Sequence, residues 1–149
     1  MLKVVVEKMN NTLSTKPLDK KLGIKPGLNI LFINQPEGYL KGLIKENYNP
    51  SISSTTFDKI PKSGNFDFIQ IFAHSRERLE ENIFILKPLF KKNGCLWISW
   101  PKSHCDIRSN LNENIVREIG LRNGLVDIKI VSLNEDWSGL KFVYRLKDR

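Results

Sequence analysis

The feature that most constrains the fold is a set of three compact apolar runs: LNILFI at 28–33, FDFIQIFA at 66–73 and CLWISW at 95–100. Turn-forming glycine, proline or asparagine residues flank each run, which favours buried strands over helices. The intervening segments are long enough to hold helices or a further strand. Such alternation is typical of an α/β layer fold with a mostly parallel sheet.

Helical spacing and capping residues indicate the elements between and beyond these runs. We expect a polar edge strand at 52–56 and an antiparallel hairpin of 126–133 with 140–146 through the turn 134–139. Pro88 should kink or restart the end of the third helix, and Asn93–Gly94 should end it. The four expected helices are a short one capped by Ser14 or Thr15 and closed by Gly23, one over 39–46, one over 77–90, and one from the Asn110–Glu113 capping box to Asn123–Gly124.

This order of elements predicts a three-layer, Rossmann-like α/β fold. Its sheet should be twisted and mostly parallel, with about six strands and a C-terminal antiparallel hairpin. The chain has 149 residues, which suits one domain with a real core. We therefore expect an N-terminal extension over 1–16 and a single domain over 17–149.

Charge and composition bear on partners and compartment. The net charge of +8 favours anionic partners, but the lysines form only loose clusters at 16–25 and 87–92. No apolar stretch approaches the ~20 residues that span a bilayer, and the N-terminus lacks a secretory signal pattern. Two cysteines do not make a disulfide framework. These features predict a cytoplasmic protein without membrane association.

Candidate site residues follow from the predicted parallel sheet, because ligands bind beyond the carboxyl ends of its strands. Trp100 and Lys102 end the third apolar run, and Trp137 lies in the expected hairpin turn. The full set of candidate ligand-binding residues is Asn34, Gln35, Glu37, Gly38, His74, Ser75, Trp100, Lys102 and Trp137.

The stretch NGCLWISWPKSHCD holds both cysteines and two tryptophans. A strand of six residues separates Cys95 from His104 and Cys105 by roughly 20 Å, so we expect no metal site there. Trp97 and Trp100 are three residues apart and should face opposite sides of the sheet.

Arg117 lies off the apolar stripe of its predicted helix. We expect it to form a salt bridge with Asp127 or Glu113 rather than to bind a phosphate.

The sequence resembles class I S-adenosylmethionine-dependent methyltransferases in its order of elements and its closing hairpin. FDFIQIF…LKPLFKKNGCLWISWPK is similar to their fourth strand, helix and fifth strand. More closely, the chain resembles a bacterial domain family of unknown function. The motifs that carry this second resemblance are PLDKKLGIKPG, PEGY, LWISWPK, NENIVREIGLRNGLVDIKI and DWSGLKFVYR, across 17–145.

The methyltransferase resemblance implies a cofactor site that this chain has altered. The glycine-rich turn after the first strand is replaced by NQPEG, in which Pro36 lacks an N–H. The acidic residue expected after the second strand is replaced by SSTT, with Asp58 as a substitute nearby. The segment from Thr56 to Phe66 is too short for the strand and helix that the family has there. The fold is therefore predicted to be truncated.

Three hypotheses of function remain open after these observations. The leading one is a non-catalytic binding or regulatory module for a small anionic ligand, with no cofactor and with S-adenosylmethionine disfavoured. The second is an S-adenosylmethionine-dependent methyltransferase with a nonstandard pocket that uses Glu37 and Asp58. The third, based on the +8 charge, is a nucleic-acid-binding protein. The sequence names neither the ligand nor the oligomeric state.

Overall fold

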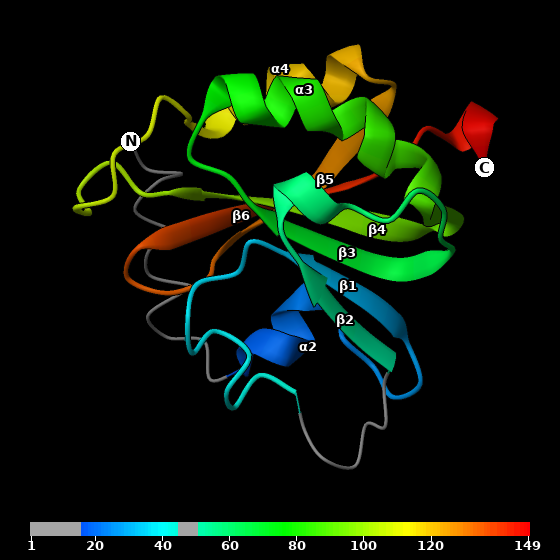
Figure 1. Ribbon diagram of the computed structural model, residues 1–149, viewed down its shortest axis with the longest axis horizontal. Helices are drawn as coiled ribbons and strands as arrows, with labels where there is room; N and C mark the ends of the chain where they lie inside the picture. Colours follow the sequence, from blue (N-terminus) through cyan, green and yellow to red (C-terminus); the bar gives the residue numbers. More distant parts are fainter. Residues whose placement is uncertain (1–15, 45–50) are drawn as a thin grey trace.

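The computed structural model describes residues 16–44 and 51–149. Helices α3 (Arg76–Leu86) and α4 (Glu113–Arg122) cover one face of a six-stranded sheet, and α2 (Leu18–Leu22) covers the other (Figure 1). The three-layer α/β prediction is confirmed. The proposed caps Ser14 and Thr15 lie outside the described residues, and the domain limits stay a prediction.

The sheet has the strand order β2-β1-β3-β4-β6-β5. Strands β2, β1, β3 and β4 run parallel to their neighbours, whereas β6 is antiparallel to both β4 and β5. This arrangement confirms the mostly parallel sheet with a closing hairpin. The strands are β1 (Asn29–Ile33), β2 (Ser51–Thr55), β3 (Phe66–Phe72), β4 (Phe90–Pro101), β5 (Leu125–Ser132) and β6 (Trp137–Tyr144).

The connection from β2 to β3 is short, as the sequence predicts. It holds a single 3-10 turn, η2 (Phe57–Lys59). Strand β2 forms one edge of the sheet. Two other 3-10 turns are η3 (Lys87–Leu89), which follows α3, and η4 (Leu146–Asp148), which follows β6. Within 16–44 and 51–149, no helix has the length and apolar character to cross a membrane.

Strand β4 divides its side chains between two cores. Trp97 is buried with Cys95 in the cluster that includes Leu22 of α2. Trp100 is buried in the cluster on the other face, with Leu96 and with residues of α3 and α4. The two tryptophans therefore face opposite sides of the sheet, because successive strand residues alternate between faces.

The start of β4 differs from the sequence expectation. We predicted a helix to about Phe90 and a strand from Cys95, but α3 ends at Leu86, Pro88 lies in η3, and Phe90 already pairs with Phe66. Residues 93–94 lie inside the strand, where the register with β3 shifts. A Cβ on Gly94 would lie 2.8 Å from the Asp67 carbonyl oxygen, so this irregularity brings two backbones too close for a side chain.

Two other boundaries also moved. The side chain that caps α4 belongs to Asn112, whose Oδ1 accepts a hydrogen bond from the Ile115 N–H (2.9 Å), and not to Asn110. The hairpin turn is shorter than predicted, so Trp137 belongs to β6. The helix expected over 39–46 is wrong in its described part, because residues 39–43 form turns and residue 44 is a bend.

Candidate functional site

The carboxyl ends of β1, β2 and β3 meet at one edge of the sheet. Asn34 follows β1 with a left-handed backbone (φ 64°), and its N–H donates to the Thr55 carbonyl (3.0 Å). Asparagine tolerates this conformation better than most residues, which explains how the chain turns sharply without a glycine. On the other side of β1, β3 ends next to Ala73 and His74.

A cavity of about 430 Å³ opens between these strand ends. We call it the switch-point cavity, because the chain continues from β1 to β2 on one side and returns to β3 on the other. It is lined by Asn34, Thr56, Phe57, Asp58, Ala73, His74, Ser75 and Arg78.

Asp58 and Arg78 form an ion pair in the lining of this cavity, with 3.1 Å between Oδ1 and Nη1. The Arg78 guanidinium also lies over the Phe57 ring, 5.8 Å from its centroid. The two paired side chains are 76% and 47% exposed, so water screens the attraction and the pair contributes only about 0.5 kcal/mol. The pair can therefore open at little cost and leave the Asp58 carboxylate able to accept hydrogen bonds from a ligand.

The N-terminus of α3 borders the cavity, but its first donors are already satisfied. The Arg76 N–H donates to Asn110 Oδ1 (2.7 Å), and the Arg78 N–H donates to the Ser75 hydroxyl (3.2 Å). Hydrogen bonds from its own backbone N–H, from the Asn110 amide and from the Ser75 hydroxyl lower the pKa of the Glu77 carboxyl. The chain's own carboxylate thus occupies the place that an anionic ligand would take.

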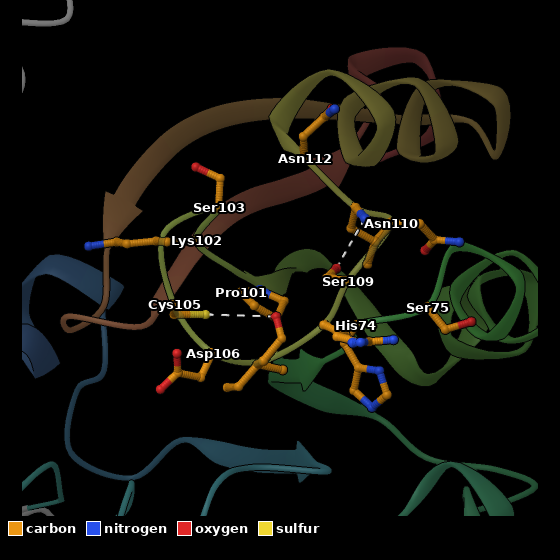
Figure 2. A pocket seen from close by; sticks show the side chains of 13 residues that line it. His74, Ser75, Pro101, Lys102, Ser103, Cys105, Asp106, Ser109, Asn110 and Asn112 are labelled. Carbon is orange, nitrogen blue, oxygen red and sulfur yellow. Dashed lines mark hydrogen bonds between the residues drawn. The ribbon is translucent and has the colours of Figure 1, made fainter.

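A second cavity of about 730 Å³ lies beyond the end of β4. We call it the loop cavity, since residues 101–103 and 105–112 form most of its wall together with His74 and Ser75 (Figure 2). Asn110 closes this loop against β3, because its N–H donates to the His74 carbonyl (3.4 Å). His74 and Ser75 line both cavities, which makes the two cavities neighbours.

The Lys102 ammonium points away from the loop cavity, as Figure 2 shows. It donates to the Ser132 hydroxyl and to the Asn134 carbonyl, at 2.6 Å each. Partial burial lowers the pKa of Lys102, and the nearby acidic residues Asp136 and Glu135 oppose that effect. Lys102 therefore ties the end of β4 to the β5–β6 turn.

The other predicted site residues line neither of these cavities. Trp100 is 5% exposed and Trp137 is 7% exposed; Trp137 packs edge-on against Phe72, with ring centroids 5.1 Å apart. Gln35, Glu37 and Gly38 lie in the turn after β1 and line neither cavity. Of the nine candidates, Asn34, His74, Ser75 and the Lys102 stem border a cavity, and their ligand-binding role stays a prediction.

Sequence reasoning missed several cavity residues. Thr56 directly follows β2, so the same rule about strand ends applies to it. Arg78 and Asn110 had no such signal, because their place depends on how α3 and the loop after β4 fold back against one another.

Both cysteines are free, Cys95 buried and Cys105 partly exposed in the loop. In the described part of the chain, no three His, Cys, Asp or Glu residues gather in a way that could hold a metal ion.

Comparison with known proteins identifies the fold. A methyltransferase from Aquifex aeolicus described as S-adenosylmethionine-dependent aligns with a TM-score of 0.62 at 16% identity, over 83% of this chain and 85% of that one. One from Bacteroides fragilis, in complex with S-adenosyl-L-homocysteine, aligns with a TM-score of 0.59 at 12% identity, over 93% and 81%. A TehB-like S-adenosylmethionine-dependent methyltransferase from Corynebacterium glutamicum aligns with a TM-score of 0.56 at 11% identity, over 96% of this chain and 97% of that one.

These likenesses show that the protein has a class I methyltransferase-like Rossmann fold. No family model matches the chain, and no curated protein matches it. At such low identities the alignments show the fold alone. The resemblance to the bacterial domain family rests on the sequence motifs.

Proposed function

We propose that the protein binds a small nucleoside-type ligand of the S-adenosylmethionine class in the switch-point cavity. The observation that carries this proposal is the cavity's position at the carboxyl ends of β1, β2 and β3, where the strand order reverses. Its volume of about 430 Å³ falls within the range of small-molecule sites. The structural neighbours described as binding S-adenosylmethionine or its product make this ligand class the first to test.

The lining residues fit part of such a ligand. The Thr56 hydroxyl and the Asp58 carboxylate can accept hydrogen bonds from ribose hydroxyls, and Phe57 offers an apolar surface. The Asn34 side chain supplies both a donor and an acceptor. Because the donors of the α3 N-terminus are taken, we propose a ligand that presents hydroxyl groups and a base in place of the small anionic ligand expected from the sequence.

Asp58 and Glu37 provide a matched test, since only Asp58 lines the cavity. We expect Asp58→Asn to weaken the binding of S-adenosylmethionine, S-adenosylhomocysteine or adenosine about tenfold in isothermal titration calorimetry, because it removes one charge-assisted hydrogen-bond acceptor. Glu37→Gln should leave the affinity unchanged. Equal losses in both variants, or absence of binding by the wild-type protein, would refute the proposed site.

A second candidate function is methyl transfer, favoured by His74 and Ser75, which line both cavities. S-adenosylmethionine would supply the methyl group from the switch-point cavity. The loop cavity, about 730 Å³, would hold the acceptor. His74 borders both cavities, and its imidazole would be the group that accepts a proton from an acceptor that loses one.

Labelled S-adenosylmethionine tests this second function with a cellular extract. Transfer of label to an acceptor, with a loss of rate but retained cofactor binding in His74→Ala, would support it. Tight cofactor binding without transfer to any fraction would leave a binding module as the function.

A further inference from the structure

A third cavity lies at the amino edge of the sheet, at the opposite ends of the strands from the candidate ligand site. It has a volume of about 390 Å³. Its wall includes Lys87, Lys91 and Lys92 together with Asn65, Phe90 and Tyr144. Lys87 comes from the 3-10 turn after α3, the other two lysines begin β4, and Tyr144 ends β6.

The charges of these lysines are not balanced within the cavity. Lys91 is neutralised by Asp67, with 2.9 Å between its Nζ and Oδ1. The ammonium groups of Lys87 and Lys92 lie instead over the Tyr144 ring, 5.6 Å and 4.3 Å from its centroid. Within the described residues neither has a carboxylate partner, so two positive charges are held near one ring without an anion.

Arginines from the C-terminal segment extend this positive surface. Arg149 Nε donates to the Tyr144 carbonyl (2.8 Å), and Arg145 Nη2 donates to the Leu121 carbonyl (2.9 Å). The Lys87 Nζ lies close to the turn that follows α4, since a Cβ on Gly124 in that turn would lie 2.6 Å from it. We call this surface the amino-edge basic patch; it consists of Lys87, Lys91, Lys92, Arg145 and Arg149.

We propose that the amino-edge basic patch binds the phosphate backbone of a nucleic acid. Its cations are spread over a surface, and each has donors left over after its contacts within the protein. A site for one free phosphate would need donors that converge on a point, usually with backbone N–H groups, whereas a row of phosphates matches separate cations. The net charge of +8 would assist the approach of such a polyanion.

The double substitution Lys87→Gln with Lys92→Gln tests this proposal. Binding of a fluorescently labelled single-stranded RNA of about 16 nucleotides is measured by anisotropy over a series of salt concentrations. Each phosphate contact contributes about 0.7 to the slope of log K against log salt for a single strand, so the variant should lose about 1.4 from the slope.

Lys41→Gln with Lys59→Gln is the matched control, because it removes the same charge from exposed positions that line none of the three cavities. The control should keep the wild-type slope, and thermal melting should show that both variants are folded. Equal slope losses in the two variants, or no RNA binding at low salt by the wild-type protein, would overturn the proposal.

A membrane surface is the other source of many phosphates. Phosphatidylserine vesicles are therefore mixed with the wild-type protein and sedimented. Vesicle binding that needs Lys87 and Lys92, in the absence of RNA binding, would equally contradict a nucleic-acid site. The test is independent of Asp58→Asn, which should leave the RNA affinity unchanged.

Discussion

Replacing Gly120 by alanine should destabilise the protein, although alanine is the better helix former. Gly120 lies in α4 and is buried against β6. A Cβ at this position would lie 2.0 Å from Cε1 and 2.5 Å from Cζ of the Phe142 ring. Phe142 is fully buried, so its ring cannot move into solvent to make room.

Two opposing free-energy contributions set the expected magnitude. Alanine stabilises a helix interior over glycine by about 1 kcal/mol. Overpacking of a well-packed core costs about 1–3 kcal/mol, and the 2.0 Å approach places this clash at the upper end of that range. We therefore expect a net loss of about 2 kcal/mol in the free energy of unfolding. With a urea m value of about 2 kcal/mol per molar, the midpoint should fall by about 1 M.

Urea denaturation of four proteins measures this effect: the wild type, Gly120→Ala, Phe142→Leu and the double variant. The smaller leucine makes room for the new methyl group, so the two substitutions should couple by more than about 0.5 kcal/mol in the double-mutant cycle. A Gly120→Ala protein that is more stable than the wild type, or strictly additive effects, would show that the ring does not limit the helix position.

Two further predictions concern stability. Burial raises the pKa of the Cys95 thiol to about 11 from its ordinary value of 9.0, so the unfolded chain ionises first and the free energy of unfolding should fall between those pH values. Urea titrations at several pH values should show a smaller fall for Cys95→Ala. The predicted salt bridge of Arg117 is confirmed, since it pairs with both Asp127 (2.8 Å) and Glu113 (2.5 Å). Arg117→Met removes both contacts and should lower the free energy of unfolding by about 1 kcal/mol. The exposed pair of Arg122 offers the control, since Arg122→Met should change the urea midpoint much less.

Local sequence patterns predicted most of the sheet, because a strand with both faces buried must be a short apolar run. The alternation in β4 also assigned Trp97 and Trp100 to opposite cores. Errors arose where local signals compete. Asn93–Gly94 has the composition of a turn, yet pairing with β3 extends β4 back to Phe90. Asn110 has the spacing of a cap, yet its Oδ1 accepts a hydrogen bond from the first N–H of α3, and it does not cap the helix that follows it.

The candidate site was predicted in position but only partly in its residues. Strand ends are readable from the sequence, which is why the candidates included Asn34, His74 and Ser75, all of which line a cavity. The direction of a long side chain cannot be read from the sequence, because it depends on hydrogen-bond acceptors that other segments bring close. Lys102 is the clearest example: it follows a strand end, but its ammonium is held by Ser132 and Asn134 of the hairpin.

The order of apolar runs and turns in this chain was enough to specify layered strands and helices, because burial and hydrogen bonding of each segment are local requirements. Folding alone determined which distant side chains meet. It placed Asp58 opposite Arg78 at one edge of the sheet, and gathered Lys87, Lys92 and Arg149 around Tyr144 at the other. These groupings depend on crossovers and strand registers across the whole sheet, which no short window of sequence contains.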